Sequence, residues 1–428
     1  MTWLDLSPGD PYGIHNLPYG VFTRSEKPDE ARIGVRVGDA VLDLHAAEEA
    51  DLIESDGVLG DGDGGFAGRT LNAFMARGRA AWTAARTRIT ELLTDPAHRT
   101  AVEPLLVPLA EVTMRMPFEV ADYVDFYCFE HHATNVGRMF RPDQAPLLPN
   151  WKRLPVGYHG RSGTVVVSGA DIVRPSGQRR GTKAPTPSMR NARDSAPSPD
   201  PVFGPSTRLD IETEVGFVVG TPSRLGSQVP ADQFAEHVFG IVLLNDWSAR
   251  DIQAWEYQPL GPFLGKSFAT SISPWVVPLD ALSAAEVEAL PQDPAPLPYL
   301  SKGRGPGYDL RLSVSWNGTV VAEPPFREMY WTPAQQLAHL TVNGASLRTG
   351  DLYASGTVSG PEKRQRGCFL ELTWSGAEPV TLSDGAQRTF LEDGDTVTIT
   401  GFAPGPGGTM VGLGEVTGAI RPAIAGSS

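Results

Sequence analysis

Glycine and proline occur so often along this chain that few of its apolar segments can be long helices. Of its 428 residues, 46 are glycine and 38 are proline. Glycine supplies the positive φ angles of tight turns, and proline interrupts helices and strand ladders. The apolar runs between them are mostly short, so we expect a mainly β protein. The length also exceeds one ordinary hydrophobic core, which favours two or more domains.

The chain divides into two units, residues 1–117 and 118–428. In the first unit, Gly20–Phe22 and Ile33–Leu42 have the composition of short strands. The apolar residues of segment 71–93 recur at helical spacing, and the pattern ends before Pro96. This periodicity predicts one amphipathic helix.

The second unit consists mostly of short segments typical of strands, with few helix signals. The clearest helix start is Thr332, because Pro333 suits the first helical position and Gln335 completes a capping box. The pair Asn343–Gly344 marks its end. The segment Ser176–Ser206 is rich in proline, serine and basic residues, which predicts an exposed loop.

The charge balance argues against two classes of partner. The chain has 36 basic and 50 acidic residues, a formal net charge of −14. Such a field repels nucleic-acid backbones and anionic membranes, so we expect neither as a partner and favour a small-molecule substrate. Only Cys128 and Cys368 are present, and the first residues lack the pattern of a signal peptide. We therefore expect a cytoplasmic location.

Three acidic residues alternate with apolar residues in Leu209–Val219. If this segment is one strand, Asp210, Glu212 and Glu214 share the face opposite the core. That face is either solvated or holds a hard cation such as Ca²⁺ or Mg²⁺, and the spacing alone leaves both readings open.

Two further acids favour the metal. Asp125 lies in Asp122–Tyr127, which reads as an extended segment. Asp246 ends the apolar run Gly240–Asp246, which predicts a buried strand with a carboxylate at its C-terminal end. Each signal is weak by itself, and together they suggest a shared cation site.

A polar helix is expected directly after Asp246. Ser248 and Asp251 have the spacing of a capping box. Arg250, Gln253 and Tyr257 then follow one another three and four residues apart, so they share one helix face. A guanidinium, an amide and a phenol together suit a carboxylate or enolate oxygen. An ordinary polar helix face is the other reading.

The remaining candidates for chemistry are a lysine, a histidine pair and a glutamate. Lys266 lies in a loop dense in glycine and proline, which presents it on a stiff backbone. His131 and His132 lack zincin spacing, so a general base is a better reading than a zinc ligand. Glu371 lies in the strand-like, apolar segment Phe369–Thr373, where a buried acid needs a partner.

Taken together, these segments resemble the fumarylacetoacetase family. The matching runs occur in the family's order: Gly13–Phe22, Asp125–Tyr127, His132–Gly137, Leu148–Trp151, Leu154–Arg161, Asn245–Gln253, Gly261–Ser267 and Ala354–Gly360. They are long and cover most of the chain, so chance is not a serious alternative.

The resemblance implies a role for most of the residues singled out above. It assigns metal ligands to Asp125, Glu212, Glu214 and Asp246, and a second cation to the neighbourhood of Asp246, Lys266 and Thr270. It assigns the general base to His132 with Glu371 as its partner, and oxyanion stabilisation to Arg250, Gln253 and Lys266. It assigns substrate contacts to Tyr127, Arg141, Tyr158, Gln253, Tyr257 and Thr357. It gives no role to Asp210 or His131, which we read as structural.

The resemblance also implies an architecture and an activity. The expected fold is a small SH3-like β-barrel followed by a mixed β-roll, in a homodimer. The expected reaction is hydrolysis of a carbon–carbon bond in 4-fumarylacetoacetate, with a divalent cation (Ca²⁺ or Mg²⁺) as cofactor. Two alternatives remain: a hydrolase of acylpyruvates or a related 1,3-diketone acid, and a binding protein without catalysis.

Overall fold

A computed structural model describes residues 2–53, 65–182 and 197–424 of the chain. Strands dominate it, which confirms the expectation of a mainly β protein. The central sheet contains 13 of the described strands. Its main path runs through β4 (Leu106–Pro108), β3 (Ala40–Asp43), β2 (Lys27–Val37), β1 (Tyr19–Arg24), β17 (Trp275–Pro278), β14 (Val238–Asp246), β13 (Thr213–Val219), β22 (Leu352–Ala354), β6 (Tyr123–Phe126) and β7 (Gly157–His159). Three strands branch from this path: β5 (Val112–Arg115), β8 (Val165–Val167) and β16 (Thr270–Ile272).

The strands of the N-terminal unit continue directly into this sheet. Strand β1 pairs with β17 of the second unit through Tyr19↔Val276 and Gly20↔Trp275. It also pairs with β2 and β5, and β3 pairs with β4. Among the described strands no ladder joins β4 to β5, so the expectation of a closed barrel is not confirmed.

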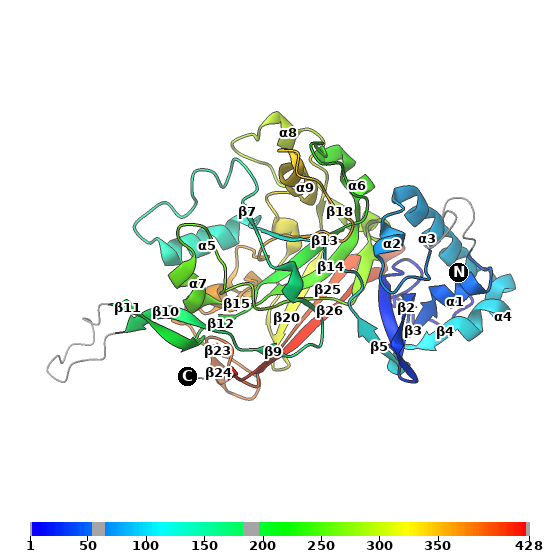
Figure 1. Cartoon of the computed structure of the whole chain (residues 1–428), viewed down its shortest axis with the longest axis horizontal. Helices are drawn as coiled ribbons and strands as arrows, with labels where there is room; N and C mark the ends of the chain where they lie inside the picture. The colour runs from blue at the N-terminus through cyan, green and yellow to red at the C-terminus, as the bar shows by residue number, and fades with distance from the viewer. Residues whose placement is uncertain (1, 54–64, 183–196, 425–428) are drawn as a thin grey trace.

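The helices of the N-terminal unit lie at one end of the molecule (Figure 1). The periodic segment 71–93 forms two helices rather than the single one predicted: α2 (Asn72–Met75) and α3 (Arg79–Thr94). The break is at Gly78, whose φ of +83° is a left-handed value that a helix cannot contain. The core contacts survive the break, because Phe74 and Trp82 both pack against Phe239 of β14.

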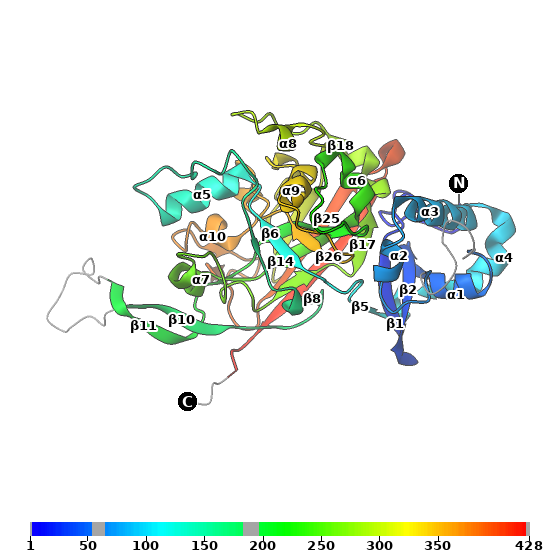
Figure 2. The same ribbon diagram turned by 45° about the horizontal axis from the view of Figure 1, so that its top comes forward.

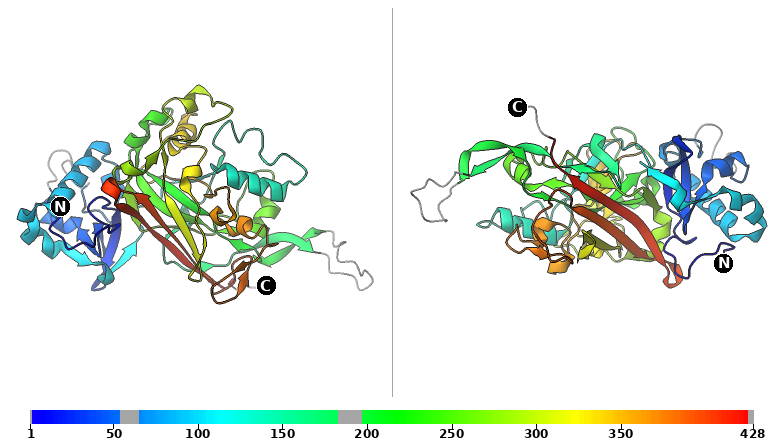
Figure 3. Two further views of the ribbon diagram at one scale, coloured as in Figure 1. Left: turned by 180° about the vertical axis from the view of Figure 1, so that it is seen from behind. Right: turned by 90° about the horizontal axis from the view of Figure 1, so that it is seen from below.

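A second sheet of five strands covers the central one. Its order is β21 (Thr319–Ala322), β20 (Arg311–Trp316), β25 (Thr396–Pro404), β26 (Met410–Arg421) and β9 (Ile172–Val173). In the view from behind, the long red strands β25 and β26 lie in front of the central sheet (Figure 3, left). Gly401 of β25 lies against Leu243 of β14, and Gly418 of β26 lies against Trp247. The main hydrophobic core fills the space between the two sheets.

Helix α9 (Pro333–Thr341) begins as the sequence predicted. The Thr332 hydroxyl accepts from the Gln335 N–H, and the Gln335 side chain accepts from the Thr332 N–H. The capping box is therefore confirmed. No helix in the described part of the chain is long and apolar enough to cross a bilayer.

The segment Ser176–Ser206 is not the loop that its composition suggested. Its described ends form the antiparallel hairpin of β10 (Ser176–Thr182) and β11 (Pro197–Pro205), with residues 183–196 outside the described range. The hairpin projects from the body of the protein beside helix α7 (Arg250–Glu256) (Figure 2). Its inner end packs on this helix, since Gly177 lies against Ile252.

Candidate active site

Strand pairing brings together acids that are far apart in the sequence. Asp125 on β6 lies opposite Ala354 of β22, and β22 pairs in turn with β13, which carries Glu214. On the other side of β13, Thr213 lies opposite Asn245, the residue before Asp246. The register of these strands therefore gathers acids from three segments of the chain.

The segment Leu209–Val219 is not the single strand that was predicted. Leu209 and Asp210 form β12, which pairs with β15 (Ser248–Ala249), and β13 starts only at Thr213. Because residues 211 and 212 belong to neither strand, Asp210 and Glu214 do not lie on one strand. All residues of β13 are buried, so the reading of a solvated acidic face is wrong.

Asp125, Glu212 and Glu214 form a buried cluster whose carboxylate oxygens lie within 4.8 Å of one another. Asp125 Oδ1 and Glu214 Oε1 have no hydrogen-bond partner. Burial and the neighbouring carboxylates raise the pKa of Asp125 and of Glu214 well above the ordinary values. Buried, unpartnered carboxylate oxygens at this separation fit a hard divalent cation.

Asp246 lies beside this cluster, but both of its oxygens already have partners. Oδ1 accepts from the Thr270 hydroxyl at 3.0 Å, and Oδ2 accepts from Lys266 Nζ at 2.6 Å and Tyr158 Oη at 3.2 Å. Lys266 also contacts Glu212. Burial by itself would raise the pKa of Glu212, but the cations Lys266 and Arg250 hold this pKa below its ordinary value. A cavity of about 310 Å³ opens onto Tyr158, Asp246 and Lys266.

Arg250 connects the acid cluster to a second part of the site. Its Nη1 donates to Glu212 at 2.7 Å and to Gln253 at 3.3 Å, and its Nε donates to Asp210 at 2.8 Å. Asp210 also accepts from the N–H groups of Phe369 and Leu370. Asp210, for which we expected a structural role, joins Arg250 to the turn that carries Glu371.

Helix α7 exists as predicted, but its capping box does not. The N-terminal cap residue is Ala249, which makes no side-chain capping bond. The Ser248 hydroxyl donates to the Asp246 carbonyl oxygen, and the Asp251 carboxylate accepts from Ser206 and Thr207. The capping box does not form because Ser248 donates to the nearby Asp246 backbone and the distant Ser206 and Thr207 engage Asp251.

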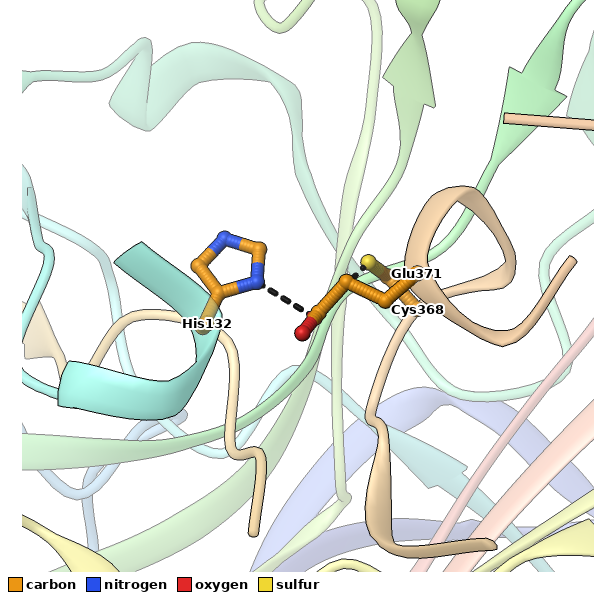
Figure 4. Close-up of side chains that lie close together, drawn as sticks. All are labelled: His132, Cys368 and Glu371. Carbon is orange, nitrogen blue, oxygen red and sulfur yellow. Dashed lines mark hydrogen bonds and ion pairs between the residues drawn. The ribbon is translucent and has the colours of Figure 1, made fainter. Parts of the chain in front are cut away.

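His132 and Glu371 form a buried pair, 2.5 Å apart between Nδ1 and Oε2 (Figure 4). His132 lies on helix α5 (Glu130–Phe140). Glu371 lies in the helical turn α10 (Phe369–Leu372), not in the strand suggested by its apolar neighbours. Burial opposes ionisation of Glu371, but His132 and hydrogen bonds lower its pKa to about 2. The carboxylate is therefore ionised and orients the imidazole.

Cys368 brings a third possible metal ligand to this pair. However, His132 Nδ1 is bound to Glu371, whose carboxylate accepts from three further side chains. Burial also keeps the pKa of the Cys368 thiol well above its ordinary value, so no thiolate is available. The group is a hydrogen-bonded dyad with its supports, not a metal site.

The residues expected to contact substrate are spread around these two clusters. The ring of Tyr127 stands edge-on to His132, with centroids 5.1 Å apart. Thr357 Oγ1 is buried without a partner, and Arg141 Nη2 donates to the Pro146 carbonyl oxygen. The Tyr257 side chain contacts Phe140 at the end of helix α5 and Gln258, which follows helix α7.

Three supports of Glu371 were not singled out from the sequence: Asn135, Ser359 and Cys368. Asn135 follows His132 by three residues on a helix, a spacing that could have indicated a shared face. Ser359 lies 12 residues from Glu371 in the chain, and no local pattern connects the two.

Comparison with known proteins finds relatives that span almost the whole chain. Residues 15–117 match the fumarylacetoacetase N-terminal family, and residues 122–421 match the fumarylacetoacetate (FAA) hydrolase C-terminal family. The chain belongs to the fumarylacetoacetase family. Relatives in this family include fumarylacetoacetases from Homo sapiens, 46% identical with 99% of each chain covered, and from Oryza sativa, 45% identical with 99% of this chain and 97% of the relative covered.

Solved structures share the family fold at low sequence identity. A fumarylacetoacetate hydrolase from Exiguobacterium antarcticum matches with a TM-score of 0.54 at 16% identity, covering 95% of this chain and 99% of its own. A maleylpyruvate hydrolase from Sphingobium matches with a TM-score of 0.50 at 15% identity, covering 95% and 100%. At such identities these matches support the fold alone.

Asp210→Asn should lower the thermal stability of this family member. The substitution leaves the buried Arg250 guanidinium with one ionised partner fewer and turns an amide N–H₂ toward backbone donors. Breaking a buried ion pair typically destabilises by about 3–5 kcal/mol. Differential scanning calorimetry would measure the change. Asp171→Asn, which removes an exposed pair with Arg421, is the control and should leave the melting temperature nearly unchanged. Equal melting temperatures for both variants would contradict the linking role of Asp210.

Proposed function

We propose that this protein hydrolyses the carbon–carbon bond of 4-fumarylacetoacetate, giving fumarate and acetoacetate late in tyrosine and phenylalanine breakdown. The observation that carries the proposal is the 46% identity to a fumarylacetoacetase over 99% of both chains, together with a histidine–glutamate dyad near a buried acid cluster. The alternative, a hydrolase of acylpyruvates, is not favoured, because the relatives that match the full length are named fumarylacetoacetases.

His132 is the proposed general base. Because Nδ1 donates to the ionised Glu371, Nε2 keeps its lone pair and can accept a proton from water. The water then attacks the carbonyl carbon next to the bond that breaks. The His132 ring is buried, which keeps its orientation fixed and limits competition from bulk solvent.

Asp125, Glu212, Glu214 and Asp246 are the proposed ligands of a divalent cation, Ca²⁺ or Mg²⁺. Such a cation stabilises the negative charge that a 1,3-diketone develops when its carbon–carbon bond breaks. We place a second cation near Asp246, Lys266 and Thr270. The Lys266 ammonium, which has no lone pair for a metal, would donate to a substrate oxygen there. The unpartnered oxygens of Asp125 and Glu214 support this assignment.

Arg250, Gln253 and Lys266 are the proposed donors to the tetrahedral oxyanion. Their partners already fix them before substrate arrives, so little reorganisation is needed during the reaction. The proposed substrate contacts are Tyr127, Arg141, Tyr158, Gln253, Tyr257 and Thr357. Arg141 supplies a positive charge for a substrate carboxylate in an otherwise acidic protein.

The proposal includes the domain architecture, the oligomeric state and the location of the protein. We take residues 1–117 as an SH3-like domain and residues 118–428 as the catalytic β-roll, in a homodimer located in the cytoplasm. Size-exclusion chromatography with light scattering would test the dimer.

The decisive experiment is loss of diketone absorbance after mixing the protein with fumarylacetoacetate. We expect turnover that disappears with a chelator and returns with Ca²⁺ or Mg²⁺, since the cation stabilises the leaving carbanion. Undiminished turnover in the chelator would overturn the metal assignment. Turnover of fumarylpyruvate without turnover of fumarylacetoacetate would instead establish the acylpyruvate alternative.

A further inference from the structure

The Glu371 carboxylate accepts hydrogen bonds from four side chains. Oε2 accepts from His132 Nδ1 at 2.5 Å, from the Ser359 hydroxyl at 2.8 Å and from the Cys368 thiol at 3.2 Å. Oε1 accepts from Asn135 Nδ2 at 2.9 Å. Glu371 is fully buried, so these four groups replace the water that would otherwise solvate its charge.

The surroundings fix two of these groups as donors. The Ser359 oxygen accepts from the Gly367 N–H at 3.2 Å, which directs its own hydrogen toward Glu371. The Cys368 thiol keeps its proton because burial and the adjacent carboxylate raise its pKa. Asn135 lies one helical turn after His132 on α5, so the helix positions this amide and the imidazole together.

We propose that Asn135, Ser359 and Cys368 are positioning residues: they saturate the Glu371 carboxylate, so that it holds His132 through Nδ1 and leaves Nε2 as the base. This inference rests on the proposed function for its catalytic meaning. A carboxylate with His132 as its single partner would bind a protonated imidazole more strongly, because the whole negative charge would face it. Sharing that charge among four donors weakens the preference for the protonated imidazole, so that the neutral form is retained.

The number of donors to Glu371 should set the pH at which activity falls on the acidic side. Removing a donor concentrates charge on the bond to His132 and raises the pKa of the imidazole. Since His132 must be neutral to act as a base, the acidic limb of the rate profile moves to higher pH. Other charged or titratable groups that act on the dyad or on the adjacent Cys368 thiol include Glu212, the Tyr127 phenol, Asp210, Arg250 and Arg366, which donates to the Glu371 carbonyl oxygen. None of them is changed by the substitutions.

The test compares Cys368→Ala and Ser359→Ala with a variant that restores a donor. In each alanine variant the acidic limb of kcat/KM should move up by ~0.5–1 pH unit, and further in the double variant. Cys368→Ser keeps a hydroxyl donor and should return the limb toward that of the parent. Ser273→Ala is the matched control, because Ser273 is equally buried but bonds only the Trp275 backbone.

A purely structural role predicts something different. It lowers the melting temperature and reduces kcat at every pH, without moving the limb, and that result would overturn the proposal. NMR titration of the His132 imidazole, assigned by comparison with His132→Gln, separates this inference from the proposed function. An unchanged His132 pKa in the alanine variants would also overturn it. A raised pKa in a protein without turnover of fumarylacetoacetate would support the positioning and reject the proposed function.

Discussion

His132→Ala should lower kcat by about a hundredfold or more while KM for fumarylacetoacetate changes little. General-base catalysis contributes roughly 10²–10⁴ to a rate, and the substitution removes the imidazole that Glu371 orients. The residues proposed to bind the substrate carboxylates stay in place, so ground-state binding should persist. Steady-state kinetics, with substrate-analogue binding by calorimetry, would measure both quantities.

His131 provides a matched control on the adjacent position. Its side chain is 39% exposed and lies 3.6 Å from Glu328, on a different side of helix α5 from the Glu371 pair. His131→Ala should therefore keep kcat within about a factor of two, since neither the dyad nor the acid cluster is touched. If both variants retained the activity of the parent, the assignment of His132 as the base would be wrong.

Asp125→Asn should abolish the stabilisation that Ca²⁺ or Mg²⁺ gives, yet make the metal-free protein more stable. Burial and the nearby Asp246 charge raise the pKa of Asp125, so its ionised form is unfavourable in the folded chain. Stability from such a group is present below the ordinary carboxyl pKa and is lost as pH rises through the raised value. The neutral amide removes this loss at neutral pH. Melting temperatures with and without cation would show both effects.

Glu212→Gln should weaken cation binding too, but with the opposite effect on the metal-free protein. Lys266 and Arg250 both pair with Glu212, and they lower its pKa against the effect of burial. Removing the charge takes a partner from two buried cations, so the metal-free melting temperature should fall. Calorimetry should show at least a tenfold loss of cation affinity in both variants. Unchanged affinity in either one would remove that residue from the ligand set.

Some local patterns in the sequence were sufficient to predict structure. The capping box at Thr332 involves residues three apart, and its donors and acceptors are set by the helix itself. The apolar run ending at Asp246 forms the fully buried strand β14, as its composition indicated. Arg250 and Gln253 share a helix face and touch each other, as their spacing predicted.

Other local patterns failed because tertiary contacts outweighed them. Asp251 has capping-box spacing to Ser248, but its carboxylate accepts from Ser206, 45 residues away in the chain. Glu371 has the apolar neighbours of a strand residue, yet its segment forms a short helix. Asp210 accepts hydrogen bonds from the first two N–H groups of this helix. Segment Ser176–Ser206 has the composition of a loop, and its ends pair as a hairpin supported by α7.

The sequence by itself determined the mainly β character, the family membership and the residue types available for chemistry, because composition, periodicity and long matching runs are local properties of the chain. Only the tertiary structure decided which acids meet and which pair with cations. Strand register brings Asp125 to Glu214, and it separates Asp210 from them to join Arg250 with the turn of Glu371. Register and side-chain pairing depend on contacts between residues from separate segments of the chain, and no short pattern in the chain records them.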